Sequence, residues 1–334
     1  MGVYAKGAFW AGVEVQVLLL WLGGGVFAFW RKNAIFVCMM DSSAALPFTV
    51  PTHQVREEGD VVYARVRGHW SEAPVGKPFH TLLRAIRTLR TRPLDLKMDI
   101  YVPSDKAQAS SRPLLLMMHG GSFLFGNRKE AGQAAWCRHF AALGYVAASI
   151  DYRLGFPPTR KGLLRAERDA TADAGRALQY LLRRTDLGID PQRVFLAGTS
   201  AGAIIALNLA YGRNVSSPFR IRAIGDFWGY VRDLSILDNA RIPILAFQSE
   251  HDPVVPFDRG YPIRAKQFSS EVYGTKATTD KARQNGIPCE LHACPERHHR
   301  LHLDRENQLT PRFYEIRDAM ARFFAEAMTQ VQKV

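Results

Sequence analysis

The chain has 334 residues, of which 47% are hydrophobic and 22% are charged. This composition excludes an intrinsically disordered protein, because the apolar residues suffice for a large core. Lysine and arginine outnumber aspartate and glutamate by 44 to 31, which gives a formal net charge of +13. The arginines are spread along the chain rather than gathered in a tail or a stripe. The charge therefore predicts a basic surface and no nucleic-acid partner.

Residues 1–50 form a hydrophobic leader. Between Ala8 and Trp30 only Glu14 and Gln16 interrupt the apolar residues, and basic residues stand on both sides. A cleaved signal peptide and an uncleaved membrane anchor both fit this pattern. We therefore expect an exported protein, periplasmic or secreted, or one that associates with a membrane. A third interpretation is a true start at Met39 or Met40, which would make the protein cytoplasmic.

Residues 51–334 are predicted to form a single α/β domain, because short apolar runs alternate with longer amphipathic stretches. The first two runs alternate apolar and polar residues, as exposed antiparallel strands do, and the later ones are almost wholly apolar, as buried parallel strands are. The pattern predicts a mostly parallel central sheet with helices on both faces and an antiparallel N-terminal edge. The predicted strands are Val61–Val66, Leu96–Val102, Leu114–Met118, Tyr145–Ile150, Val194–Ala197, Ala223–Trp228, Ile244–Phe247 and Cys289–Ala293.

Three of the longer stretches have helical patterns. Apolar residues recur at three- and four-residue steps from Leu164 to Leu181, and a second helix is expected from about Ala201 to Tyr211. A last helix opens with Thr310 as a cap before Pro311. Residues 258–286 are polar and weakly patterned, so we expect a cap-like insertion over the sheet.

The most specific motif is Gly-x-Ser-x-Gly, formed by Gly198, Ser200 and Gly202. It follows the predicted strand Val194–Ala197 and opens a predicted helix. A serine on such a sharp strand-to-helix turn has a strained backbone, and residues two positions away approach so closely that only glycine fits. The turn exposes the Ser200 hydroxyl at a helix N-terminus, where the N–H of Ala201 faces the negative charge that develops on an attacked carbonyl.

A second glycine-rich segment begins at His119, directly after the predicted strand Leu114–Met118. Glycines allow such a loop to turn its N–H groups inward. We expect the N–H groups of Gly121 and Ser122 to complete an oxyanion hole with that of Ala201. His119 is expected to brace the loop rather than to transfer protons.

With these motifs the chain resembles the α/β-hydrolases of the esterase/lipase branch, which includes the carboxylesterases. The resemblance covers about residues 95–328 and rests on the two glycine motifs, on residues 151–154, on residues 249–256 and on a late histidine cluster. It implies a nucleophile, an acid and a histidine in that order along the chain. Residues 151–154, Asp-Tyr-Arg-Leu, resemble a structural element of the family, and we assign them no catalytic role.

The resemblance implies that Ser200 is the nucleophile and that Asp252 is the acid. Asp252 follows the apolar strand Ile244–Phe247, at the carboxyl edge where catalytic groups of parallel sheets gather. Asp226 and Asp233 are rivals for this role, but both lie one strand earlier.

The histidine is expected among His298, His299 and His302. Alignment on the preceding strand and on Pro295 places His299 at the family's histidine and His298 where the family commonly has glycine. His299 is therefore the predicted base, with His298 as the alternative catalytic histidine and His302 as a lesser candidate. A metal cluster of the three histidines is the competing interpretation, but their compact spacing does not suit a tetrahedral zinc site, and we expect no metal.

The resemblance implies a serine hydrolase that cleaves carboxylic esters through an acyl-enzyme. It requires no cofactor, and its partner is a small-molecule ester. Short-chain esters are favoured, ahead of acetylated sugars and long-chain lipids. Two alternatives are a serine peptidase with the same triad and a non-catalytic binding protein on the same fold.

Overall fold

The computed structural model describes residues 3–4, 18–22, 25–29, 37–39, 46–73, 91–105, 111–212, 218–264, 266–267 and 269–329. The chain divides into two compact units, Met1–Pro47 and Phe48–Val334. The larger unit holds every residue that the sequence predicts for the site.

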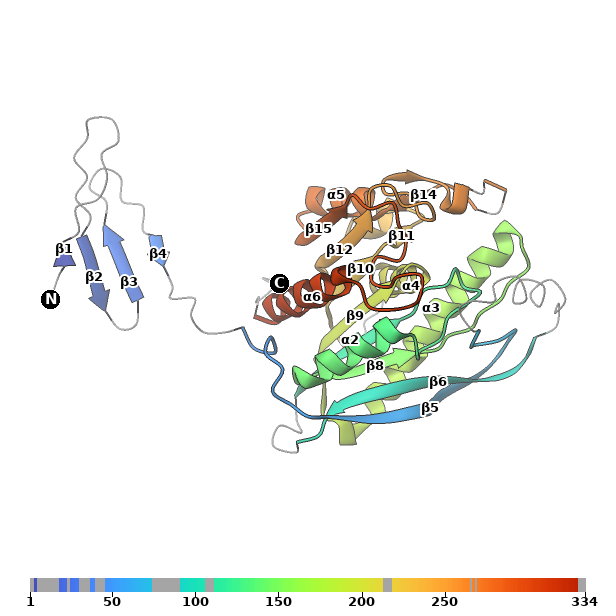
Figure 1. The fold of residues 1–334 in the computed structure, drawn as a ribbon, viewed down its shortest axis with the longest axis horizontal. Helices are drawn as coiled ribbons and strands as arrows, with labels where there is room; N and C mark the ends of the chain where they lie inside the picture. The colour runs from blue at the N-terminus through green and yellow to red at the C-terminus, as the bar shows by residue number, and fades with distance from the viewer. Residues whose placement is uncertain are drawn as a thin grey trace. The chain divides into compact units, whose positions relative to one another are not determined.

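An eight-stranded sheet forms the centre of the larger unit, in the order β15-β12-β10-β9-β7-β8-β6-β5 (Figure 1). Strand β6 pairs antiparallel with both β5 and β8, and the remaining neighbours pair in parallel. Each strand contains or overlaps one of the eight predicted strands, so the predicted fold class and its antiparallel edge are confirmed. The bounds are β5 Val55–Gly68, β6 Arg92–Pro103, β7 Arg112–Met118, β8 Val146–Ile150, β9 Ile189–Thr199, β10 Ile221–Phe227, β12 Ile244–Ser249 and β15 Cys289–Cys294.

Helices cover both faces of this sheet. Side chains of α2 and α6 pack in one hydrophobic cluster with one set of strand side chains, and those of α3, α4 and α5 pack in a second cluster with the alternate set. The helix α4 is buried along almost its whole length, which explains why its sequence is apolar all round. The bounds are α2 Ala131–Ala142, α3 Arg160–Arg183, α4 Ala201–Tyr211, α5 Thr275–Gln284 and α6 Pro311–Thr329, with short 3₁₀ turns η1 Thr185–Leu187, η2 Leu234–Leu237 and η3 Pro262–Arg264.

The segment 258–286 is an insertion only in its first half. There β13 (Arg259–Gly260) and β14 (Val272–Gly274) form a small antiparallel sheet with β11 (Tyr230–Val231). The second half is α5, the crossover helix between the parallel neighbours β12 and β15. The predicted boundary therefore assigns a helix of the main fold to a cap.

The smaller unit contains four short antiparallel strands in the order β1-β2-β3-β4. They are β1 Val3–Tyr4, β2 Leu18–Leu22, β3 Gly25–Phe29 and β4 Val37–Met39. Much of the predicted leader, including Glu14 and Gln16, lies outside the described residues. Across the described ranges no helix has the length and apolar character that spanning a bilayer requires.

Candidate active site

Ser200 lies at the sharp turn between β9 and α4 and is 7% exposed. Its backbone has φ 52° and ψ −114°, a conformation that residues other than glycine rarely adopt. A Cβ atom on Gly198 would lie 2.3 Å from the carbonyl carbon of Gly202, and one on Gly202 would lie 2.0 Å from the carbonyl oxygen of Met118. Both glycines are therefore required by close backbone approaches that hold the strained serine in place.

The structure brings Ser200, His299 and Asp252 into one chain of hydrogen bonds. Nε2 of His299 lies 2.8 Å from Oγ of Ser200, and Nδ1 lies 2.8 Å and 3.0 Å from the two carboxylate oxygens of Asp252. An ionised carboxylate only accepts hydrogen bonds, so Nδ1 of His299 is the donor. The neutral ring then has Nε2 free to accept the proton of the Ser200 hydroxyl. The Asp252 side chain has no exposed surface, and that of His299 is 14% exposed.

The carboxylate of Asp252 is held by the loop that follows β12. The N–H groups of Val254 and Val255 donate to Oδ1 at 2.7 Å and 3.1 Å, and Nε2 of Gln248 lies 3.4 Å from Oδ2. Gln248 also donates to the carbonyl of Val255 and accepts from the N–H of Thr275, so its buried amide is bonded at both ends. Sequence reasoning missed Gln248, although a glutamine in an otherwise apolar buried strand is a detectable signal.

The other candidate histidines do not contact the nucleophile. His298 is exposed, and its Nδ1 bonds to the carbonyl of Arg300 at 3.0 Å. His302 is buried between the rings of Trp136 and Trp228. No group of three or more histidine, cysteine or acidic residues in the described part of the chain is arranged to hold a metal ion.

The rival acids have local partners of their own. Asp226 is fully buried at the end of β10 and accepts from the N–H of Gly229 at 2.9 Å. Asp233 caps the turn η2 through the N–H of Ser235. Neither is bonded to His299, whereas Asp252 is.

The loop after β7 passes beside the nucleophile. A Cβ on Gly120 would lie 3.3 Å from Cβ of Ser200, and a Cβ on Gly121, whose φ is +119°, would lie 2.2 Å from the carbonyl oxygen of Phe125. Ser122 also has a positive φ, and it lines the same cavity as Ser200 and Ala201. Ala201 is the first residue of α4, so its N–H has no acceptor within the helix. These positions are consistent with an oxyanion hole formed by Gly121, Ser122 and Ala201.

His119 braces this loop from inside the protein. Its ring stacks on Tyr152 at a centroid distance of 4.3 Å, and the Tyr152 hydroxyl donates to the His119 carbonyl at 2.7 Å. Nδ1 of His119 bonds to the carbonyl of Gly120. Burial lowers the pKa of His119 to about 4, so the ring stays neutral near pH 7.

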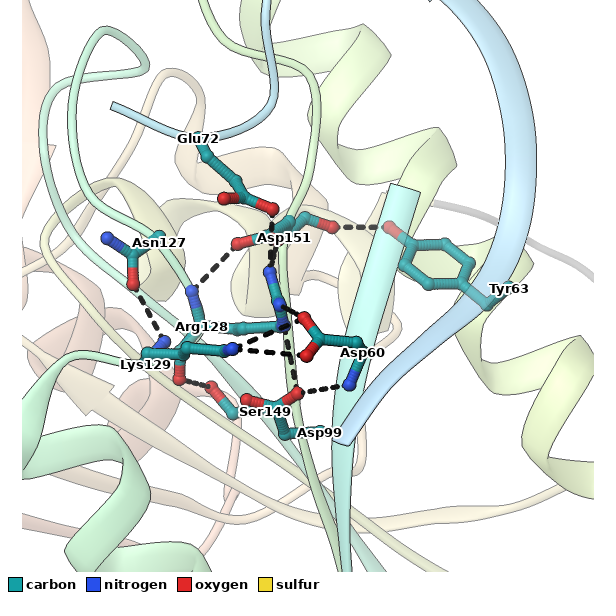
Figure 2. Close-up of polar contacts among 9 residues, drawn as sticks. All are labelled: Asp60, Tyr63, Glu72, Asp99, Asn127, Arg128, Lys129, Ser149 and Asp151. Atoms are coloured by element: carbon teal, nitrogen blue, oxygen red, sulfur yellow. Dashed lines mark hydrogen bonds and ion pairs between the residues drawn. The ribbon is translucent and has the colours of Figure 1, made fainter. Parts of the chain in front are cut away.

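A buried arginine anchors the far end of the loop (Figure 2). Arg128 is 1% exposed, and its guanidinium contacts four carboxylates. Nε donates to Asp99 at 2.9 Å, Nη1 donates to Glu72 at 2.8 Å and to Asp151, and Nη2 donates to Asp60. We call these five residues the Arg128 cluster. It joins the loop to the strands β5 and β6, to Asp151 directly after β8, and to Glu72 (Figure 2).

An apolar cavity of about 430 Å³ opens beside the serine. Besides Ser122, Ser200 and Ser269 its walls are apolar or aromatic. They come from the loop after β7, from α3 and the segment before it, from α4, from β11, from the loop after β12 and from the insertion. The Tyr230 hydroxyl donates to Glu167, so this wall residue has its polar atom already bonded. The further lining residues are Phe123, Leu124, Phe156, Pro158, Leu163, Ala201, Ile204, Val254, Val255, Pro262 and Ile263.

Parts of this chain are similar in sequence to known proteins. A model of the BD-FAE family matches residues 98–241. The probable isoprenylcysteine alpha-carbonyl methylesterase ICMEL1 of Oryza sativa subsp. japonica is 32% identical over 33% of this chain and 24% of that protein. The non-reducing polyketide synthase Preu3 of Preussia isomera is 33% identical over 42% of this chain. The match spans only 6% of the synthase, so the chain is similar to a small part of it.

Solved structures are similar to this chain in fold over most of its length. Esterase 2 of Thermogutta terrifontis, phosphorylated by paraoxon, has 21% identity and a TM-score of 0.55 over 72% of this chain and 92% of that one. Esterase B of Lactobacillus rhamnosis has 16% identity and a TM-score of 0.53 over 83% of this chain and 87% of that one. The chain therefore has the α/β-hydrolase fold, and parts of it are similar to a methylesterase and to the BD-FAE family model.

Proposed function

We propose that the protein is a serine hydrolase of carboxylic esters. One observation carries the proposal, namely the continuous hydrogen-bond chain from Oγ of Ser200 through the His299 ring to Asp252, with 2.8 Å at each of its two links. This geometry suits a hydroxyl that must lose its proton as it attacks.

In the proposed reaction, Nε2 of His299 takes the Ser200 proton while Oγ bonds to the ester carbonyl carbon. Negative charge moves to the carbonyl oxygen, where the N–H groups of Gly121, Ser122 and Ala201 stabilise it. The tetrahedral species collapses, the C–O bond to the alcohol breaks, and His299 gives its proton to the leaving oxygen. Water, activated by the same ring, then releases the acid from the acyl-enzyme. Asp252 keeps the ring oriented and stabilises the imidazolium.

We propose short-chain acyl or acetyl esters as substrates. The cavity beside Ser200 is lined mostly by apolar side chains, among them Leu163 of α3, Ile204 of α4 and Ile263 of the insertion, and offers few free polar groups to an acyl chain. A series of p-nitrophenyl esters with increasing acyl length, together with acetylated sugars, tests the assignment. A maximum at long acyl chains would contradict it.

The substitution Ser200→Ala tests the proposed reaction. We expect the loss of essentially all hydrolysis of a short p-nitrophenyl ester with an unchanged circular-dichroism spectrum, because the nucleophile is gone and the fold is not. Ser104→Ala, at an exposed position, is the matched control and should keep full activity. The wild-type rate should also fall in acid, because a protonated imidazole cannot accept a proton.

A fluorophosphonate probe separates this proposal from a non-catalytic binding protein. An active serine hydrolase should form an adduct at Ser200, found by mass spectrometry of the peptide that contains it. Absence of an adduct in the wild-type protein would overturn the proposal. A peptidase with the same triad would also be labelled, but it would cleave peptide substrates in a parallel assay.

We propose further that residues 1–47 direct the protein to export or to a membrane, because the sequence between Ala8 and Trp30 is largely apolar. Fractionation of cells that express the full chain, or a chain lacking this segment, tests the idea. Equal recovery of both forms from the cytoplasm would reject it.

A further inference from the structure

A second buried polar group of residues surrounds the start of α2. It consists of His119, Glu130, Gln133 and His302, and we call it the Glu130 cluster. His119 and Gln133 have no exposed surface, and His302 is 1% exposed. Polar atoms of all four side chains have no hydrogen-bond partner among the described residues, namely Nε2 of His119, Oε2 of Glu130, Oε1 of Gln133 and both ring nitrogens of His302. None of these atoms takes part in the proposed reaction.

The carboxylate of Glu130 faces the loop that carries the catalytic histidine. One oxygen lies 3.8 Å from Nε2 of His302, and the other lies 3.7 Å from Nη2 of Arg300. Burial raises the pKa of Glu130, but His302 and Arg300 outweigh it and hold the pKa below its ordinary value. Glu130 is therefore a charged group that attracts Arg300, the residue after His299, and it attracts His302 as well when that ring is protonated.

Aromatic contacts connect His302 to the proposed base, His299. The ring of His302 stacks on Trp136 of α2 at 5.2 Å and lies 5.2 Å from the ring of Trp228. Trp228 in turn meets the His299 ring edge to face at 6.4 Å. A displacement of His302 thus changes the packing of Trp228, which borders His299.

We propose that Glu130 is a positioning residue that holds the loop of His299 through its negative charge. The inference rests on the proposed function, because it assigns His299 the role of base. Both carboxylate contacts are longer than a hydrogen bond, so the hold is electrostatic, and a neutral side chain of the same shape does not reproduce it. Glu130 is also the N-cap residue of α2, but its side chain makes no capping hydrogen bond.

The charge is tested by comparing Glu130→Gln with Glu130→Asp. We expect Glu130→Gln to lower kcat for a short p-nitrophenyl ester by about tenfold to a hundredfold, with KM nearly unchanged, because a misplaced base slows the chemical step and leaves the acyl cavity intact. The rate of fluorophosphonate labelling of Ser200 should fall in parallel. Glu130→Asp keeps the charge and should restore a large part of kcat.

Gly132 allows the same site to be disturbed from the other side without removing any charge. A Cβ at this position would lie 2.5 Å from Cδ2 of His302, whose ring is enclosed by two tryptophans. We expect Gly132→Ala to lower kcat as Glu130→Gln does, while the greater helix propensity of alanine opposes a loss of melting temperature. Gly175→Ala is the control, since the nearest atom to its Cβ is a Leu209 methyl at 3.7 Å.

The outcomes separate this inference from the proposed function. If wild-type Ser200 is not labelled, the proposed function itself fails. If the wild type is labelled and folded Glu130→Gln keeps its kcat, only the positioning role is overturned. A lower melting temperature with an unchanged kcat per folded molecule, or a KM effect alone, would likewise assign Glu130 a purely structural role.

Discussion

Two polar clusters with mostly buried central residues, Arg128 and Glu130, adjoin the same loop, and they differ in how completely their groups are paired. In the Arg128 cluster each guanidinium nitrogen donates to a carboxylate (Figure 2). In the Glu130 cluster the Glu130 carboxylate lies 3.7 Å from Arg300 and 3.8 Å from His302, and several polar atoms of the cluster are unpaired among the described residues. Breaking a fully bonded buried charge network leaves buried charges unpaired and is costly to the fold, whereas a charge at 3.7 Å or more from its partners acts on them with a weaker and less directional attraction.

The largest effect on stability should come from Arg128→Leu. The substitution leaves Asp151, with no exposed side-chain surface, and Asp99, at 11%, without their cation. We expect the free energy of unfolding at pH 8 to fall by about 3–5 kcal/mol, measured by urea denaturation. Arg138→Leu is the control, because its ion pair with Glu57 is half exposed and should contribute less than about 1 kcal/mol. Similar losses in both variants would contradict the comparison.

The stability loss caused by Arg128→Leu should depend on pH, because Arg128 pairs with the buried carboxyl of Asp151. Burial raises the pKa of Asp151 to about 7, although Arg128 lowers it. The folded protein therefore keeps a proton between about pH 4 and 7 that the unfolded chain has released, so this carboxyl makes stability fall as pH rises through that window. Removal of Arg128 raises this pKa further and extends the window upward. We expect Arg128→Leu to lower the free energy of unfolding less at pH 5 than at pH 8. Equal losses at the two pH values would show that the pKa of Asp151 does not depend on Arg128.

A pair of buried glutamines should give the smallest of these effects. Gln248→Leu leaves the carbonyl of Val255 and the N–H of Thr275 without their hydrogen-bond partner. It should lower the free energy of unfolding by about 1–3 kcal/mol. Gln133→Leu removes only a 3.4 Å contact with Thr199 and a carbonyl without a partner among the described residues, so its effect should stay below about 1 kcal/mol. Equal losses in urea denaturation would mean that the Gln133 amide is bonded as well as that of Gln248.

The eight strands of the central sheet could be predicted because each is a short apolar or alternating run. The helix α2 could not, because it is rich in alanine and buries residues around much of its circumference, so no polar stripe marks it. The helix α5 falls in a segment whose polar, weakly patterned sequence predicts an insertion, and its threonines have low helix propensity. In the structure Thr278 and Thr279 are buried and donate their hydroxyls to carbonyls four residues earlier, which satisfies these groups inside the helix.

The residues of the candidate triad could be chosen from chain order and position relative to predicted strands, and the structure brings the chosen three together. Their supporting residues could not be chosen in this way. Arg128, Glu130 and Gln248 have no motif of their own, and each acquires its partners only when distant strands and loops meet. Glu130 in particular is separated from His302 by most of the domain's sequence.

The contact between Gly202 and the Met118 carbonyl limits how this chain can diverge. Because main-chain atoms meet there without a side chain between them, substitutions of the Met118 side chain leave the contact intact. A methyl group at position 202 would instead push the strand carrying the first glycine loop away from the helix carrying the nucleophile. At residue 118, a fully buried core position, other apolar side chains of similar size should therefore be tolerated, whereas at residue 202, in direct contact with it, substitution should be nearly excluded.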